Sequence, residues 1–267
     1  MKVRQNLVLA TLGAMITVPV SSADTLDMVR DSISGSIPME VEYNPGPYLS
    51  LNASANFLED VNIKNIPIGS NLFGIDNGKI AFNAGMSLEI GVGIPINSDL
   101  ALEFSSGLAY NAVDSVTGIL NAGALGQDAV AGGDGEIYQV PLVAELVLTV
   151  FDHDGFRVDL HGGGGLQWTK ADISNIYAAS AGAAAGNASL SGNAFAFRYQ
   201  GGIDCVVDIS SSVSLGASFT YSGTTESNFG TATFASNVPG RSLVGTEEVK
   251  TGSFSNITMG INLRIEF

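Results

Sequence analysis

Residues 82–94 of the chain read FNAGMSLEIGVGI, a run in which two kinds of side chain alternate. Every second position is apolar, and the positions between carry Asn, Gly, Ser or Glu. A period of two residues is typical of a β-strand with two unlike faces. This stretch therefore predicts a strand that lies between an apolar surface and a polar one.

Seven other segments repeat the same alternation along the chain. They cover residues 48–57, 100–111, 138–149, 156–169, 197–208, 213–222 and 256–267. Eight such strands predict an all-β fold, an eight-stranded antiparallel up-and-down barrel.

The connections between these segments alternate in length. Three are tight, at residues 95–99, 151–155 and 210–212, whereas residues 58–79, 112–136, 171–193 and 223–253 form long links that we expect to be loops. Short turns at one rim and long loops at the other are typical of a transmembrane β-barrel in a Gram-negative outer membrane. Strand parity then predicts that both termini are periplasmic.

Composition excludes several classes of protein. The chain has 267 residues and a net charge of -15, so a nucleic-acid partner is not expected. One Cys and two His leave little for a metal site, and we expect no cofactor. No uninterrupted apolar run of about 20 residues follows the N-terminus, which argues against a helical membrane protein.

A soluble, lipocalin-like barrel would alternate in the same way, but it would hide its apolar face. The polar face here is mostly Gly, Ser, Asn and Thr, whereas a water-facing surface would carry more charge. Aromatic residues also gather near the long-link ends of the segments, where a transmembrane barrel has its outer aromatic girdle. The predicted girdle consists of Phe57, Phe82, Tyr110, Tyr138, Trp168, Tyr199, Tyr221 and Phe254.

The N-terminus resembles a secretory signal. Lys2 and Arg4 precede an apolar run that ends in small residues, which predicts a signal peptide over residues 1–23 with cleavage after Ala23. Residues 24–45 are polar and are expected to form a periplasmic leader, and residues 46–267 the barrel.

Three motifs give the chain a resemblance to a known family. They are YQVPLV at 138–143, the Gly-rich strand HGGGGLQW at 161–168 and the C-terminal NLRIEF at 262–267. With the strand pattern from about Tyr43 onward, they resemble the small outer-membrane β-barrel proteins of the OmpA/OmpX type, including bacterial surface antigens. The resemblance implies that the terminal Phe267 is read by the barrel-assembly machinery.

The polar face also carries charges of both signs, which we expect to point into the barrel lumen. Unpaired charges in a narrow lumen are costly, so a salt-bridged plug is the preferred interpretation and a narrow porin-like channel for ions or small solutes is the alternative. The predicted network consists of Glu89, Glu103, Glu145, Arg157, Asp159, Arg198, Asp204, Arg264 and Glu266.

Catalysis is not expected from the sequence. His161 precedes three glycines and shares a face with Asp159, but the chain contains no G-x-S-x-G elbow. The sequence therefore predicts a protein that is not an enzyme, with a lipid-modifying outer-membrane enzyme as a distant alternative.

The long links are the remaining place for a function, and three of them are acidic. We expect a structural or surface-interaction role there, with outer-membrane lipid, lipopolysaccharide or a host surface ligand as partners. The acidic residues are Glu59, Asp60, Asp76, Asp114, Asp128, Asp134, Glu136, Glu226, Glu247 and Glu248.

Overall fold

The computed structural model describes residues 46–64, 67–68, 73–121, 127–178, 187–235 and 244–267. The expected signal peptide with its cleavage site at Ala23 and the expected leader at 24–45 lie outside these residues.

The described residues form thirteen strands. Their bounds are β1 Tyr48–Leu58, β2 Val61–Lys64, β3 Pro67–Ile68, β4 Phe73–Phe82, β5 Gly85–Pro95, β6 Leu100–Asn121, β7 Gln127–His153, β8 Phe156–Ala178, β9 Asn187–Ser210, β10 Val213–Thr224, β11 Ser227–Ala235, β12 Val244–Thr251 and β13 Ser255–Glu266. Within the same residues, no helix is long and apolar enough to cross a bilayer.

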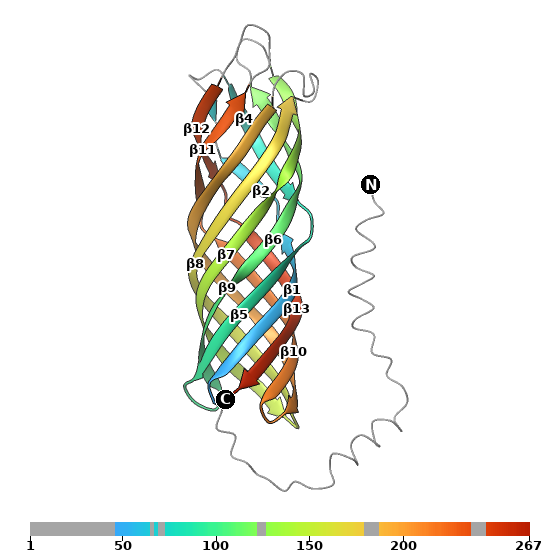
Figure 1. Cartoon of the computed structure of the whole chain (residues 1–267), viewed down its shortest axis with the longest axis vertical. Coiled ribbons are helices and arrows are strands. Elements are labelled where there is room, and N and C mark those ends of the chain that lie inside the picture. The colour runs from blue at the N-terminus through green and yellow to red at the C-terminus, as the bar shows by residue number, and fades with distance from the viewer. Residues whose placement is uncertain (1–45, 65–66, 69–72, 122–126, 179–186, 236–243) are drawn as a thin grey trace, which may run out of the picture. The chain divides into compact units, whose positions relative to one another are not determined.

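Eight of these strands close into a ring, which we call the lower barrel. The order around it is β1, β5, β6, β7, β8, β9, β10 and β13, and β13 pairs with β1 along the whole strand, from Tyr48 opposite Glu266 to Leu58 opposite Asn256. The predicted eight-stranded antiparallel barrel is therefore confirmed. The three tight turns and the C-terminus lie at its lower end (Figure 1).

The chain continues upward into a second closed ring, the upper barrel. Here β6, β7, β8 and β9 run on without a break and are joined by β11, β12, β2 and β4. The ring closes through β4 on β6 and, with only two register pairs, β12 on β2. The prediction of long loops is thus largely wrong, because most residues of those links extend the strands of the barrel.

These links form strands because their residues still alternate, but the apolar and polar residues exchange faces: apolar side chains point outward in the lower part of a strand and inward in the upper part. In the lower part of β8, Leu166 faces outward and Gln167 is buried inside; above, Asp172 faces outward and Ile173 is buried inside. The sequence 170–177 still has a strand pattern, but its apolar face now points into the barrel. A strand with an apolar inner face and a polar outer face is stable when water, rather than lipid, surrounds the barrel.

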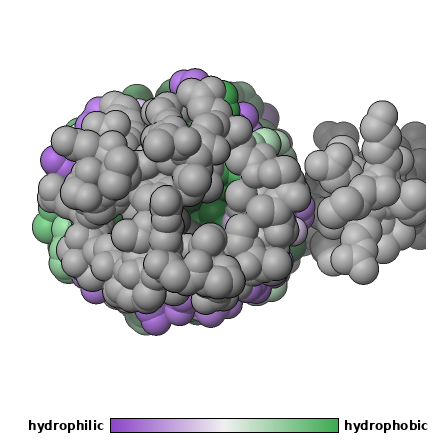
Figure 2. Space-filling view, turned by 90° about the horizontal axis from the view of Figure 1, so that it is seen from above, coloured by the Kyte–Doolittle hydropathy of each residue, from purple (hydrophilic) through white to green (hydrophobic). Residues whose placement is uncertain are grey.

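The two barrels therefore have opposite surfaces. The lower barrel presents large apolar side chains outward, such as Met86, Leu142 and Phe195, each more than 60% exposed. Such an outer band is stable only against lipid hydrocarbon, as in outer-membrane barrels. Viewed from above, hydrophobic residues are visible in the middle of the ring (Figure 2).

The reversal occurs at one row of residues, which we call the boundary row. Tyr110, Tyr138, Lys170 and Asn193 lie directly opposite one another on β6, β7, β8 and β9. The chain neighbours of Tyr110, Tyr138 and Lys170 on both sides are buried, as is Ala194 beside Asn193, so all four side chains face outward. The row separates the outward apolar band from the outward polar surface.

Candidate functional site in the barrel lumen

The lowest layer of the lumen is built around Asp159 of β8. Its Oδ2 lies 3.2 Å from Nε of Arg157 and 3.1 Å from Nη1 of Arg264, while Thr149 donates a 2.7 Å hydrogen bond to Oδ1. Glu266 lies 3.9 Å from Nη1 of Arg157, and the guanidinium of Arg264 stacks 4.2 Å from the ring centroid of Tyr48. Because Asp159 is fully buried, its charge is balanced by these partners rather than by water.

The middle layer is organised by His161, two residues above Asp159 on the same strand. Its Nδ1 lies 3.2 Å from Oε1 of Glu145 on β7, and its Nε2 lies 3.3 Å from Oγ1 of Thr220 on β10. A hydroxyl, an imidazole and a carboxylate are therefore connected in the order found in nucleophile–base–acid triads.

A cavity of about 30 Å³ adjoins this arrangement. Glu89, Glu103, Asp204 and the three residues just described are among those that line it. Oδ1 of Asp204 is buried and has no hydrogen-bond partner among the residues that the structure describes, while Glu103 accepts a 2.7 Å hydrogen bond from Ser50. A space of this size has room for about two water molecules, so the layer can bind water or move a proton but cannot admit an ester or a sugar.

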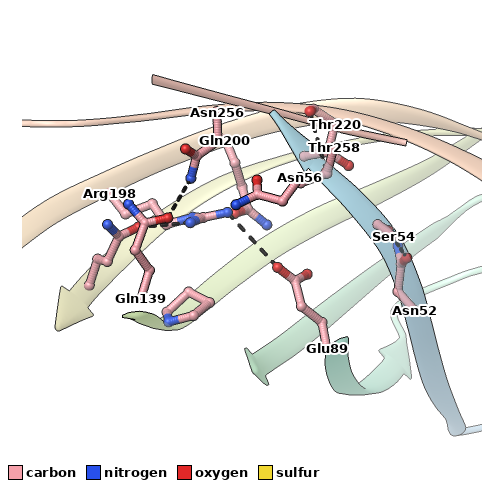
Figure 3. Close-up of polar contacts among 12 residues, drawn as sticks. Asn52, Ser54, Asn56, Glu89, Gln139, Arg198, Gln200, Thr220, Asn256 and Thr258 are labelled. Carbon is pink, nitrogen blue, oxygen red and sulfur yellow. Dashed lines mark hydrogen bonds and ion pairs between the residues drawn. The ribbon is translucent and has the colours of Figure 1, made fainter. Parts of the chain in front are cut away.

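The third layer centres on Arg198 of β9. Its Nη2 lies 3.9 Å from Glu89, and its Nε and Nη1 donate hydrogen bonds of 2.6 and 2.8 Å to Gln200 and Gln167 (Figure 3). The side chain is 3% exposed, so charge and amide groups fill the lumen at this height.

Two amide pairs form the next polar layer. Asn256 donates a 2.8 Å hydrogen bond to Gln139, and Asn56 donates one of 2.5 Å to Asn111 (Figure 3). All four side chains are buried. They separate the charged lumen from the interior of the upper barrel.

The interior of the upper barrel is apolar and packed. Its core consists of Leu58, Val61, Ile63, Ile80, Val113, Val116, Val130, Ile137, Ala171, Ile173, Ile176, Leu190, Ala194, Phe229, Val249 and Phe254, with Phe82 packed against it. The inward side chains therefore change along the barrel, from paired charges in the lower barrel to apolar groups in the upper one.

The structure corrects the prediction for two members of the aromatic girdle, Phe254 and Phe82. Phe254 is 1% exposed and packs edge-on against Phe229, with 6.0 Å between ring centroids, and Phe82 contacts the same core. Both lie above the reversal of the alternation, where an aromatic residue points inward to bury its ring. The expectation that they face lipid is therefore wrong.

The remaining girdle residues belong to the membrane-facing strands. Tyr110 and Tyr138 contact each other with ring centroids 5.3 Å apart, and Tyr199 and Tyr221 are exposed on the outer face. Phe57 and Trp168 are half-buried. At the C-terminus, the side chain of Phe267 is exposed, and its backbone NH donates to the carbonyl of Pro47.

The structure divides the nine residues of the predicted charge network among layers. Arg157, Asp159, Arg264 and Glu266 meet in the lowest one, and Arg198 meets Glu89 in the third. In the middle layer Glu145 pairs with His161, which the predicted network omits, and Glu103 and Asp204 line the cavity beside it. His161 lies on the polar face of its strand, and this position alone would have justified including it in the predicted charge network. The sequence does not indicate that Thr220 contacts His161, because this contact forms only when the barrel closes.

No cluster of three or more His, Cys, Asp or Glu side chains in the described part of the chain is arranged to hold a metal ion. The arrangement of the lumen is instead one of ion pairs and amide hydrogen bonds.

Neither the protein-family models nor the curated protein sequences contain a match to the chain. Solved structures do match it. Neisserial surface protein A is 14% identical with a TM-score of 0.40, and the match covers 85% of this chain and 100% of that one. The outer membrane protein OprG from Pseudomonas aeruginosa is 12% identical with a TM-score of 0.45, covering 84% and 98%. The chain thus resembles small outer-membrane β-barrel proteins, as the sequence motifs indicated.

A third match corrects the expectation about catalysis. The outer membrane protease OmpT from Escherichia coli is 9% identical with a TM-score of 0.46, and the match covers 87% of this chain and 99% of that one. An enzyme is therefore among the matched structures, and the prediction that the chain is not an enzyme is contradicted.

Proposed function

We propose that this outer-membrane barrel is a surface-interaction protein whose upper barrel stands in water above the lipid, where its polar outer face can meet a partner. The observation that carries the proposal is the reversal of the alternation at the boundary row. Above that row the strands have an apolar core and a polar outer face, which is the construction of a barrel that stands in water.

The height of the upper barrel supports this role. The residues of β7 from Gln127 to Tyr138 lie above or at the boundary row. At about 3.3 Å per residue and a strand tilt of about 40°, they rise roughly 25–30 Å. The described upper ends of these strands therefore lie at a fixed distance from the lipid headgroups.

A comparison between full-length and shortened barrels tests the surface role. In the shortened variant, tight turns replace residues 59–83, 113–135, 171–192 and 225–253, which leaves only the lower barrel. We expect that cells displaying the full chain adhere to cultured epithelial cells and to fibronectin- or laminin-coated surfaces, and that the shortened barrel abolishes this adhesion. Equal adhesion at equal surface levels would refute the role.

The filled interior supports a closed lumen as the second part of the proposal. Paired charges around Asp159 and the apolar core around Ile173 lie one above the other in the same lumen. An ion would have to displace both, and hydrocarbon contacts offer it no polar partner.

Planar-bilayer recordings distinguish the closed lumen from the alternative of a narrow channel. We expect no steady conductance from the purified monomer at neutral pH and moderate voltage. Large and steady single-channel steps, absent from a mock purification, would favour the channel.

A further inference from the structure

Asp204 of β9 lies in the middle layer of the lumen, and one of its carboxylate oxygens is unsatisfied. The residue is 7% exposed, and its Oδ1 accepts no hydrogen bond from the residues that the structure describes. A buried carboxylate oxygen is costly unless a hydrogen bond, an opposite charge or a bound ion balances it. A group other than these residues is therefore expected beside Oδ1.

The neighbouring strand makes the position of Asp204 still less favourable. Asp159 of β8 lies directly opposite it. Directly opposed residues have Cβ atoms about 4.5–5.5 Å apart, and like charges placed there repel each other. Asp159 is balanced by Arg157 and Arg264 at 3.2 and 3.1 Å, whereas Asp204 forms no ion pair within the described part of the chain. The two arginines of the lowest layer therefore leave Asp204 uncompensated.

The cavity beside Asp204 carries an excess of negative charge. The carboxylates that line it are those of Glu89, Glu103, Glu145 and Asp204. Arg198 lies 3.9 Å from Glu89, and His161, 3.2 Å from Glu145, is positively charged only when it is protonated. Even with His161 protonated, two positive charges face four negative ones. A bound cation would reduce this repulsion, whereas a neutral water molecule would not.

The cavity also has the size and the oxygen atoms that a small ion needs. Its volume of about 30 Å³ gives room for about two water molecules, or for one small ion and one water. Ser50 and Asn262 are among the residues that line it and supply hydroxyl and amide oxygens. Hard cations prefer carboxylate, carbonyl and water oxygens as ligands.

The arrangement of the carboxylates decides the charge of the ion. A divalent cation usually takes several carboxylates, and no three His, Cys, Asp or Glu side chains of the described residues are gathered to hold a metal ion. Glu145 already contacts His161, and Glu103 accepts from Ser50. One unsatisfied carboxylate oxygen among neutral oxygens matches the single charge of Na⁺ or K⁺.

We propose that the cavity of the middle layer is a binding site for one monovalent cation, Na⁺ or K⁺. Oδ1 of Asp204 is its charged ligand, and neutral side-chain oxygens and a water molecule complete the shell. The ion is part of the folded barrel and does not permeate it. The site is independent of the surface role proposed for the upper barrel.

Equilibrium unfolding by urea in detergent, followed by tryptophan fluorescence, tests the site. The chloride salt of Na⁺, K⁺ or N-methyl-D-glucamine is used at one pH and one ionic strength, so that general screening is equal. The organic cation is too large for a cavity of this size. Because the barrel unfolds and refolds during the measurement, a closed lumen does not keep the ion from its site.

The test variant is Asp204→Asn, which keeps the shape of the side chain and removes its charge, and Asp204→Ala is a second variant. The matched control is Asp154→Asn, because the Asp154 side chain is 91% exposed in a turn. Heat-modifiable gel migration verifies that each variant is folded.

We expect Na⁺ or K⁺ to stabilise the parent and Asp154→Asn relative to the organic cation. An ion that binds only the folded state raises the folded-to-unfolded ratio about tenfold for each tenfold increase in its concentration above Kd. In Asp204→Asn and Asp204→Ala the ratio should be the same in all three salts within twofold. Equal unfolding of the parent in the three salts would overturn the site, even if neither variant folds. An unchanged cation dependence in folded Asp204→Asn would also overturn it.

Discussion

Single residues in this protein are stabilised by partners that come from distant parts of the chain. Asp159 accepts from two arginines and a threonine on three different strands; both arginines are buried and the threonine is half-buried. Sequence alone could place Asp159, Arg157 and Arg264 on polar strand faces. It could not select which acid meets which base, since that depends on the register of β13 with its neighbours.

Replacing Asp159 by Asn keeps the shape of the side chain and removes its charge. Two buried guanidinium groups then share no carboxylate, and breaking a buried pair costs about 3–5 kcal/mol of the free energy of unfolding. Urea unfolding of the barrel in detergent, followed by the fluorescence of Trp168, the single tryptophan, measures the loss.

The matched control is Asp154→Asn in the turn between β7 and β8, where the Asp side chain is 91% exposed. It should leave the unfolding midpoint unchanged. A similar loss in both variants would show that net charge, rather than the buried pairs, sets the stability.

Strand elements follow their sequence pattern closely, and their glycines set how near two strands can approach. A Cβ atom on Gly163 of β8 would lie 2.0 Å from the carbonyl oxygen of Ala144 on β7, whereas on Gly162 its nearest neighbour would be 3.7 Å away. The Gly-rich run therefore contains glycines with different roles. Gly165 is as close to β7 as Gly163, with 2.0 Å from its Cβ position to the carbonyl oxygen of Leu142, and only the structure distinguishes these two glycines from Gly162.

Gly163→Ala should weaken the contact between β7 and β8. The added methyl forces the strands apart, which costs roughly 1–3 kcal/mol, as in other overpacked sites. Hydrogen exchange of the β7 and β8 amides should rise in this variant and remain at the parent level in Gly162→Ala. Equal exchange in the two variants would contradict the distinction.

The whole molecule consists of two stacked barrels with opposite surfaces, and this arrangement makes their stabilities separable. The upper barrel depends on its apolar core, while the lower barrel depends on lipid outside and paired charges inside. A change that affects only the core should therefore open the upper barrel and leave the lower one folded.

Ile173→Lys places a charge at the centre of the apolar core, where Ile173 is fully buried. Burial of an unpaired charge is strongly unfavourable, so the upper strands should become sensitive to proteinase K while the lower barrel stays protected in lipid vesicles. Ile119→Lys is the control, because Ile119 is 41% exposed and lies opposite Asp76. Loss of protection throughout the molecule would contradict the separation.

The sequence by itself determined the eight strands of the lower barrel, their antiparallel order and the face that meets lipid. These features follow from a period of two residues and from the lengths of the links, which are local properties of the chain. Only the tertiary structure decided that the links continue as strands, that Phe254 and Phe82 point inward, and that Thr220 meets His161. The alternation is compatible with either face turned outward. In the lower barrel the composition of the polar face decided which face meets lipid, whereas above the boundary row only closure of the ring shows that the apolar face is buried inside.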